Sequence, residues 1–220
     1  MLITGYILVA LAAYLLGSIP TGFLVARAKG VDIRTVGSGN IGATNVFRVL
    51  GKGPGIFVFA VDAAKGFVAC KVFGELGIKW FASAATPGTQ EMLPIVAGLV
   101  VVLGHNYTCW LGFKGGKGIA TSAGVLLALF PLALAVVLGI WILIFAASRY
   151  VSLASIVGAF WLPVFVWIFG YSTQRISIAA VMAALAIYKH KSNIQRLVAG
   201  TENRFGNKKS DSAAAAKSKT

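Results

Sequence analysis

Residues 119–147 read IATSAGVLLALFPLALAVVLGIWILIFAA, a run of 29 residues without a charged side chain. A transmembrane helix needs about 20 apolar residues, so this run forms either one tilted helix or two short helices that meet near Pro131. Two helices would place residues 27–53, residues 112–118, Arg149 and the C-terminal tail on one side of the membrane, with 16 of the 20 basic residues. Because cytoplasmic segments of membrane proteins are rich in Lys and Arg, we expect two helices.

The rest of the chain also has the composition of an integral membrane protein, since 58% of its 220 residues are hydrophobic. Further apolar segments cover residues 1–26, 54–73, 92–103, 153–169 and 176–188. Together with the two helices above, they predict an all-α integral membrane protein with seven transmembrane helices, its N-terminus outside and its C-terminus in the cytoplasm. We expect a kink at Pro20 and an external loop over residues 74–91.

Residues 1–206 are expected to form a single polytopic membrane domain, and residues 207–220, mostly Lys, Ser and Ala, a disordered basic tail. The net charge of +14 fits cytoplasmic loops near anionic headgroups first and anionic substrates second. Nucleic-acid binding is not expected, because the basic residues are scattered over short loops. Cys70 and Cys109 lie in or beside apolar segments, which argues against a disulfide or metal site. The first apolar segment lacks a basic start, so we expect no cleaved signal peptide.

A glycine-rich loop with two cations, Lys114 and Lys117, lies between apolar segments at residues 112–118 (GFKGGKG). Glycine lets backbone N–H groups converge on an anion and lysine adds charge, so the loop has the composition of a phosphate site. It lacks the spacing of a nucleotide P-loop, because Gly118 follows Lys117 where a hydroxyl side chain would be needed. The alternative is a flexible cytoplasmic turn whose lysines follow the charge asymmetry of membrane proteins.

Two more polar clusters fall on the expected cytoplasmic side. Residues 37–48 (GSGNIGATNVFR) interleave glycines with small polar side chains, and a helix in the second half would aim its N-terminus and Arg48 at one anion. The alternative there is an ordinary capped surface turn. Residues 188–202 predict a helix that leaves the membrane with His190 and Asn193 on one face.

Four ionisable residues need separate explanations. Asp62 and Lys65 lie one turn apart inside an apolar segment, where a charge costs about 2.5–3.5 kcal/mol on insertion scales. They either pair within the helix, or Lys65 contacts a substrate phosphate. His105 is either a packed polar group at a helix end or a site residue. Glu202, in basic surroundings, is expected to be a structural ion-pair partner.

Six motifs occur in order along the chain: residues 37–48, 62–66 (DAAKG), 104–106 (GHN), 113–121 (FKGGKGIAT), 149–155 (RYVSLAS) and 190–202 (HKSNIQRLVAGTE). Together they resemble the bacterial acyl-phosphate:glycerol-3-phosphate acyltransferases, the PlsY family. The resemblance covers nearly the whole chain up to about Arg204. One departure is Ile41, where many members are expected to carry proline, which would alter the stiffness of the turn and leave the chemistry intact.

The resemblance implies an enzyme of the bacterial cytoplasmic (inner) membrane with its active site on the cytoplasmic face. It would transfer a fatty acyl group from acyl phosphate to the 1-hydroxyl of sn-glycerol 3-phosphate, giving lysophosphatidic acid and phosphate. Membrane lipid is the other expected partner, no cofactor or metal is expected, and the sequence predicts no oligomeric state, although a monomer would suffice. Which phosphate each cationic cluster holds, and which helices hold the acyl chain, are left open.

The family's functional residues carry over to matching positions. The expected catalytic residues are Ser38, His190 and Asn193. Substrate-binding roles are expected for Asn40, Asn45, Arg48, Lys65, His105, Lys114, Gly115, Gly116, Lys117, Gly118, Thr121 and Arg196. Structural roles are expected for Asp62 and Glu202.

The expected mechanism is direct transfer without an acyl-enzyme. Acyltransferases that use thioesters rely on a His-x-x-x-x-Asp pair, but Trp110 follows His105 and Gln195 follows His190 at that spacing. An acyl phosphate is already activated, so binding the hydroxyl beside the carbonyl and stabilising charge would suffice. The proton would go to His190 or to an oxygen of the substrate phosphate.

A small transporter or channel for an organic anion is the main alternative function. Seven helices, charges within the membrane and glycine loops at helix ends would suit it. The crowding of polar motifs on one membrane face, and the lack of an inverted repeat, argue against it. A purely structural membrane scaffold is a third reading, but it would not need these polar clusters.

Overall fold

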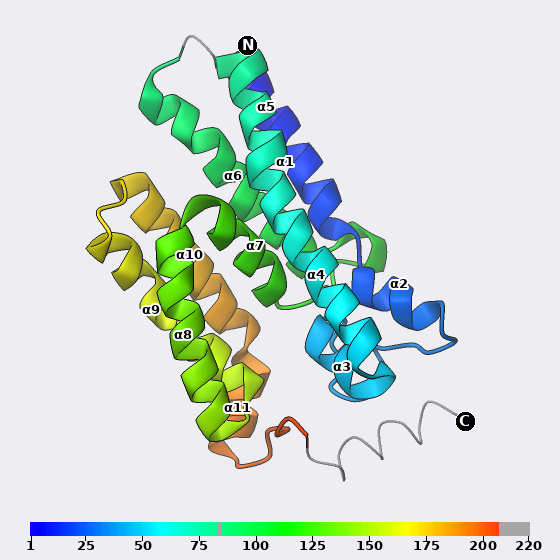
Figure 1. The fold of residues 1–220 in the computed structure, drawn as a ribbon. Coiled ribbons are helices and arrows are strands. Elements are labelled where there is room, and N and C mark those ends of the chain that lie inside the picture. The colour runs from blue at the N-terminus through cyan, green and yellow to red at the C-terminus, as the bar shows by residue number, and fades with distance from the viewer. Residues whose placement is uncertain (83–84, 207–220) are drawn as a thin grey trace. The chain divides into compact units, whose positions relative to one another are not determined.

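The computed structural model describes residues 1–82 and 85–206, and within these ranges all regular secondary structure is helical (Figure 1). The chain divides into two compact units. The first unit comprises Met1–Thr21 and Phe59–Pro131, and the second comprises Gly22–Val58 and Leu132–Thr220. Each unit therefore combines an early and a late part of the chain. That residues 1–206 act as a single domain stays a prediction, and the expected tail, residues 207–220, lies outside the described residues.

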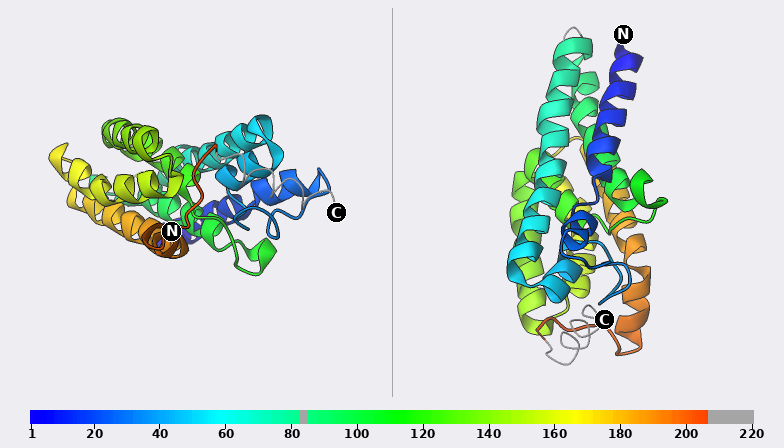
Figure 2. Two further views of the ribbon diagram at one scale, coloured as in Figure 1. Left: turned by 90° about the horizontal axis from the view of Figure 1, so that it is seen from below. Right: turned by 90° about the vertical axis from the view of Figure 1, so that its right-hand side faces the viewer.

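The first unit is organised around two long helices, α1 (Leu2–Ser18) and α6 (Pro87–Asn106), which pack along each other (Figure 2). Their backbones approach closely at two glycines. A Cβ atom at Gly17 would overlap the carbonyl of Val101, and one at Gly104 would overlap the carbonyl of Tyr14. Small residues at helix contacts are typical of membrane proteins, where van der Waals packing holds helices together.

The first apolar segment breaks at Pro20, as predicted. Helix α1 ends at Ser18, and α2 (Thr21–Arg27) starts directly after the proline. Proline has no N–H to donate and its ring excludes a helical conformation for the preceding residue, so carbonyls of the last turn of α1 lose their helical partners. Two carbonyls near the proline instead accept hydrogen bonds from side chains: Ser18 from Thr108, and Ile19 from Lys65.

The expected external loop over residues 74–91 is wrong for most of its length. Helix α4 (Lys52–Val68) continues through the π-helix η1 (Ala69–Gly74), α5 (Glu75–Gly77) and the π-helix η2 (Ile78–Ala82), and α6 starts at Pro87. The charges at Glu75 and Glu91 suggested a loop, but glutamate is a good helix former and no proline or cap interrupts residues 69–82. Thr86 ends the connection as the N-cap of α6, with Pro87 at the first helical position.

The apolar run 119–147 forms two helices, which confirms the prediction. Helix α7 (Ile119–Leu129) and α8 (Pro131–Ser148) are separated by Phe130, whose φ of −139° and ψ of 54° lie outside the helical region. A residue that precedes proline is pushed out of the helical conformation by contact with the proline ring. The break therefore follows from Pro131.

In the second unit, α9 (Val151–Ile168) and α10 (Thr173–Lys189) are joined by a short turn and pack along each other. The short helix α11 (Lys191–Val198) follows α10 after a single residue, His190. Helix α3 (Ala43–Leu50) also belongs to this unit, and it begins at the position where the glycine-rich motif predicted a helix. The second unit therefore carries two of the three polar clusters.

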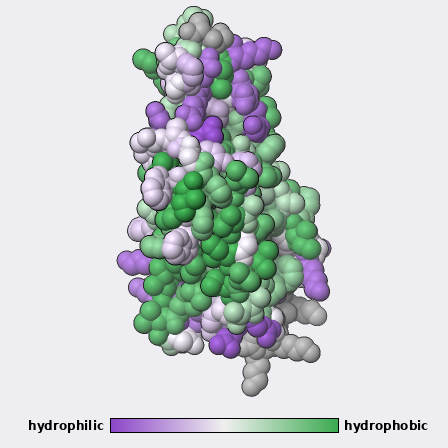
Figure 3. Space-filling model, turned by 60° about the vertical axis from the view of Figure 1, so that its left-hand side comes forward, coloured by the Kyte–Doolittle hydropathy of each residue, from purple (hydrophilic) through white to green (hydrophobic). Residues whose placement is uncertain are grey.

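Among residues 1–82 and 85–206, four helical segments are long and apolar enough to cross a membrane: Leu2–Arg27, Pro87–Leu111, Pro131–Ser148 and Val151–Ile168. These segments expose large apolar side chains. Hydrophobic residues cover much of the face shown in Figure 3, as expected for a surface in contact with lipid. Of the other expected spans, α10 has 17 residues and α7 has 11, whereas α4, with 17 residues, continues in helical turns to Ala82. The count of seven spans and the orientation of the termini therefore remain predictions.

Candidate active site

The glycine-rich loop joins the end of α6 to the start of α7 in the first unit. After Asn106 the chain makes a 3-10 turn, η3 (Cys109–Leu111), and then runs back along the last turn of α6. The N–H of Gly115 donates to the carbonyl of Asn106 over 3.2 Å, and the N–H of Gly116 donates to that of His105 over 3.0 Å. These two N–H groups hold the loop against α6 in this structure, and the expected contact of Gly115 and Gly116 with substrate remains a prediction.

The loop is flanked by cationic side chains and by the start of a helix, both of which attract anions. Lys114 is exposed and Lys117 is half-buried, and α7 starts directly after Gly118. The first N–H groups of a helix have no intrahelical acceptor and attract negative charge, so the start of α7 adds to the two lysines. A phosphate site remains the prediction for this loop, with lysine side chains and the end of α7 as its donors.

The loop glycines are required by the close approach to His105. A Cβ atom at Gly116 would overlap the imidazole of His105, and one at Gly115 would overlap the carbonyl of the same residue. The side chain of His105 is only 6% exposed. The loop therefore packs tightly against His105. A larger side chain at Gly115 or Gly116 should displace His105, and a change of His105 should displace the loop.

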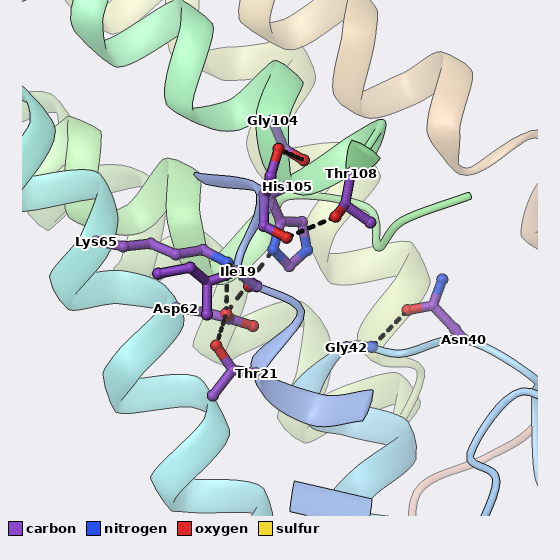
Figure 4. Close-up of polar contacts among 10 residues, drawn as sticks. Ile19, Thr21, Asn40, Gly42, Asp62, Lys65, Gly104, His105 and Thr108 are labelled. Atoms are coloured by element: carbon purple, nitrogen blue, oxygen red, sulfur yellow. Dashed lines mark hydrogen bonds and ion pairs between the residues drawn. The ribbon is translucent and has the colours of Figure 1, made fainter. Parts of the chain in front are cut away.

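A buried charge cluster lies beside His105 (Figure 4). The Lys65 ammonium is 2.8 Å from Oδ1 of Asp62, the Thr21 hydroxyl donates to the same oxygen over 3.1 Å, and Nδ1 of His105 is 3.8 Å from it. Asp62 and Lys65 are 1% and 4% exposed. The ion pair within α4, one of the two alternatives that the sequence left open, is thus present, and contact of Lys65 with a substrate phosphate remains a prediction.

The break at Pro20 connects this cluster to the loop. Lys65 donates to the carbonyl of Ile19 over 3.1 Å, and the hydroxyl of Thr108 donates to the carbonyl of Ser18 over 2.5 Å. Each of these two carbonyls, close to the proline, therefore has a side-chain donor from another part of the first unit. No role of Thr21 or Thr108 is predicted by the sequence motifs, although a proline inside an apolar segment signals carbonyls that need such donors.

Thr121 lies in the first turn of α7, where the sequence predicted a substrate-binding residue. It is fully buried, and within the described residues its hydroxyl has no hydrogen-bond partner. Its backbone carbonyl faces α4, where a Cβ atom at Gly66 would overlap it. An unsatisfied buried hydroxyl next to the loop is compatible with a ligand contact, which remains a prediction.

In the second unit, the loop before α3 is organised by the amide of Asn45. Its oxygen accepts from the N–H of Ser38 over 2.9 Å, and its nitrogen donates to the carbonyls of Ile33, Val36 and Asn40 at 3.2, 3.1 and 2.9 Å. Asn45 is 2% exposed. The side chain of Asn45 thus holds its own loop together. Contact of Asn45 with substrate remains a prediction.

Ser38 lies exposed at the tip of the same loop, between Gly37 and Gly39, whose φ values are 60° and 68°. Left-handed backbone conformations on both sides favour glycine and present the serine outward. Asn40 forms a local turn, in which its oxygen accepts from the N–H of Gly42 over 2.8 Å, just before α3 (Figure 4). Arg48 lies one turn beyond Asn45 on α3.

Glu202 gathers the third cluster. Its carboxylate accepts from Asn193 over 2.7 Å, from Ser152 over 2.8 Å and from Arg196 over 2.7 Å. Burial alone would raise the pKa of Glu202, but the hydrogen bonds from Asn193, Arg196 and Ser152 and the charge of Arg196 outweigh it and lower the pKa. The predicted structural ion pair is confirmed, with Arg196 as its partner, whereas a substrate contact of Arg196 remains a prediction.

A glycine turn brings Glu202 back to α11. Gly200 has a φ of 68°, its N–H donates to the carbonyl of Leu197, and the N–H of Thr201 donates to that of Arg196. This is the Schellman arrangement that ends many helices, and it reverses the chain. As a result, Ser152, which lies in the motif at residues 149–155 and had no predicted role, donates a hydrogen bond to Glu202.

His190 stands between α10 and α11 and is 3% exposed. Its Nδ1 atom lies 2.8 Å from the carbonyl oxygen of Ala186. A carbonyl only accepts hydrogen bonds, so Nδ1 carries a proton, and in the neutral ring Nε2 is the basic nitrogen. This tautomer suits a residue that accepts a proton.

The predicted residues thus fall into two groups, one in each unit. The first unit brings together Asp62, Lys65, His105 and the glycine loop. The second unit joins Asn193, Arg196 and Glu202, with His190 next to them in the chain, and separately builds the loop that presents Ser38.

Comparisons with known proteins identify the family. The family model for glycerol-3-phosphate acyltransferase matches residues 7–200. A glycerol-3-phosphate acyltransferase of Thermosynechococcus vestitus is 48% identical over 202 residues, which cover 90% of this chain and 94% of the relative. One of Geobacter sulfurreducens is 48% identical over 193 residues, covering 88% of this chain and 94% of the relative.

Solved structures agree with these relatives. A crystal structure of PlsY, an integral membrane glycerol 3-phosphate acyltransferase, in its glycerol 3-phosphate form is similar with a TM-score of 0.82 and 43% identity, covering 93% of this chain and 97% of that chain. The lysophosphatidic acid form of PlsY gives a TM-score of 0.79 and 41% identity at the same coverage. The chain belongs to the glycerol-3-phosphate acyltransferase family of integral membrane proteins.

Proposed function

We propose that this protein transfers a fatty acyl group from acyl phosphate to the 1-hydroxyl of sn-glycerol 3-phosphate, at the cytoplasmic face of a bacterial inner membrane. The observation that carries the proposal is the likeness, over 93% of the chain, to a PlsY crystal structure in its glycerol 3-phosphate form. The related lysophosphatidic acid form names the product of such a transfer. The choice of acyl phosphate as donor rests on the six motifs and on the absence of a His-x-x-x-x-Asp pair in the sequence.

The chemistry needs two anion sites, because both substrates carry phosphate. Lys114, Lys117 and the start of α7 supply cationic groups and N–H donors in the first unit, and Arg48 supplies a guanidinium in the second. Holding the hydroxyl next to the acyl carbonyl accounts for a large part of the rate of such transfers.

The transfer is written as one displacement. The 1-hydroxyl oxygen bonds to the acyl carbonyl carbon, the bond between that carbon and the phosphate oxygen breaks, and inorganic phosphate leaves with the electron pair. The hydroxyl proton goes either to Nε2 of His190 or to an oxygen of the departing phosphate. The Nδ1 hydrogen bond of His190 to Ala186 supports the first route, because it leaves Nε2 as the basic nitrogen.

The test is phosphate release by the purified protein in detergent, given palmitoyl phosphate and glycerol 3-phosphate. Release that requires both substrates, and a sharp loss of rate in Lys117→Ala, would support the proposal. Acyl-CoA in place of acyl phosphate should give no product. No release from well-folded protein would sink the proposal and favour an anion transporter, which uptake into liposomes would then examine.

Direct transfer has its own test. Protein is incubated with palmitoyl phosphate alone, and intact-mass spectrometry is used to look for an added acyl group. An unmodified mass supports direct transfer, whereas an acyl group on Ser38 would contradict it.

A further inference from the structure

Residues 201–206, the last ones that the structure describes, form a segment that we call the C-terminal strap. Residues 203–206 of the strap lie beyond the last of the six motifs, which ends at Glu202. The whole strap also lies outside residues 7–200, which the family model matches. The strap is bound to the turn between α8 and α9. The N–H of Phe205 donates to the carbonyl of Arg149 over 2.9 Å, and Arg204 donates to the hydroxyl of Tyr150 over 2.9 Å.

The ring of Phe205 contacts two helices of the second unit. Its centroid is 5.0 Å from that of Phe47 on α3 and 5.5 Å from that of Phe145 on α8. The contact with Phe145 is edge-on, at 75°, and Phe145 in turn stacks on Trp141 at 5.0 Å. Aromatic pairs at these separations attract each other beyond their burial, so Phe205 joins α3 to α8.

The partner on α3 is next to a residue of the proposed site. Phe47 precedes Arg48, and a Cβ atom at Gly55 would overlap the backbone of Phe47 from the start of α4. Helix α3 has only 8 residues, so its own hydrogen bonds cannot hold it and tertiary packing must do so. The ring of Phe205 is one of the contacts that fix α3.

The other end of the strap holds α11. Glu202, three residues before Phe205, accepts the hydrogen bonds of Asn193 and Arg196. One short segment therefore contacts the helix that carries Arg48 through one side chain and the helix that carries Asn193 through another.

We infer that Phe205 is a positioning residue. It holds α3 in place, so that the guanidinium of Arg48 can bind the phosphate of the substrate on which Asn193 of α11 is also expected to act. Phe205 itself touches no reacting atom and acts through Phe47. The inference rests on the proposed function for its catalytic consequence, whereas the ordering of α3 is independent of it.

The first experiment measures hydrogen exchange of residues 43–50 by mass spectrometry, in the wild type, Phe205→Ala and a matched control, Phe165→Ala. Phe165 lies on α9, with ring partners Trp161 and Phe169 at 6.1 and 6.5 Å, so its loss also removes aromatic packing. Faster exchange of residues 43–50 in Phe205→Ala alone is expected. Equal exchange in all three proteins would overturn the inference, whether or not the protein is an acyltransferase.

The second experiment measures phosphate release against glycerol 3-phosphate concentration, at saturating palmitoyl phosphate and per amount of folded protein. Phe205→Ala should lose about tenfold in kcat/KM, within the hundredfold that a displacement of about 1 Å can cost. Phe205→Tyr, which keeps the ring, should stay within about twofold of the wild type, and Phe165→Ala should match the wild type even where its unfolding temperature falls.

Two further variants keep the inference testable. Phe205→Leu retains apolar volume and replaces Phe205→Ala if the latter does not fold; wild-type kinetics in the leucine variant would overturn the inference. If Phe205 acts through Arg48, adding Phe205→Ala to Arg48→Lys should lower kcat/KM by less than it does in the wild type. Fully additive losses would contradict that route. An inactive wild type would instead refute the proposed function, and hydrogen exchange would still decide the role of Phe205 in ordering α3.

Discussion

The carboxylate of Asp62 and the ammonium of Lys65 form an ion pair at 2.8 Å, one turn apart on α4, with both side chains almost completely buried. The same Lys65 ammonium bonds the carbonyl of Ile19 beside Pro20, and the same carboxylate oxygen accepts from Thr21. The pair therefore stabilises the break in the first helix. It also lies next to His105, on which the glycine loop packs.

Asp62→Asn should be strongly destabilising, because it leaves the Lys65 ammonium buried without a countercharge. Removing one partner of a buried pair costs about 3–5 kcal/mol. The double variant Asp62→Asn, Lys65→Met should recover much of that loss, since no buried charge remains. Thermal unfolding in detergent measures both. If the double variant is folded, its KM for glycerol 3-phosphate also tests the predicted contact of Lys65 with a substrate phosphate; a double variant less stable than the single would contradict the ion-pair account.

Gly116→Ala should raise the KM for glycerol 3-phosphate by about tenfold or more, because the added methyl group must displace the His105 imidazole or the loop. Gly139→Ala on α8 is the matched control, since a Cβ atom there meets no atom within 4 Å. Steady-state phosphate release in detergent measures the effect. An unchanged KM in Gly116→Ala would show that the packing of the loop on His105 has no bearing on substrate binding.

His190→Gln should lower kcat by about a hundredfold, within the range that general-base catalysis contributes, with a smaller change in the KM for glycerol 3-phosphate. Glutamine retains an N–H donor for Ala186 but has no basic nitrogen. A kcat in His190→Gln close to the wild-type value would assign proton removal to the substrate phosphate, as the other route allows.

Glu202 should make stability depend on acid pH. Its pKa is lower in the folded state than the ordinary value of about 4.3, so its contribution to stability is complete above about pH 4.3 and is lost as the pH falls through the folded pKa. Glu202→Gln should therefore unfold at a lower temperature than the wild type near pH 7, and the difference should shrink below about pH 4.3. Glu75→Gln, which changes an exposed carboxylate on α5, should show no such convergence. A difference that stays constant down to the lowest pH would rule out the charge of Glu202 as the cause.

Local features of the structure could be read from the sequence. The break at Phe130 follows from Pro131, the break after Ser18 follows from Pro20, and α3 starts directly after Gly42, the last glycine of the motif at residues 37–48. Each depends on a few neighbouring residues, through the missing N–H of proline or the conformational freedom of glycine. The prediction failed for most of residues 74–91, where two glutamates suggested a loop although residues 75–82 and 87–91 are helical.

The composition and motif order also determined the class of protein and its family. The apolar runs demand a membrane, and the six motifs, together with the matched relatives, place the chain among the glycerol-3-phosphate acyltransferases. Chemical type can be read in this way because the functional group of a side chain, and the conformational freedom of glycine, belong to the residue itself.

Only the tertiary structure decided how each polar group is used. The N–H groups of Gly115 and Gly116 bond the end of α6, the amide of Asn45 builds its own loop, and Ser152 meets Glu202 across 50 residues. Phe205 joins Phe47 and Phe145, which are far away in the chain. A hydrogen bond or ring contact depends on distances of a few ångströms between separate segments, and these distances are set by helix packing, which no local pattern of residues specifies.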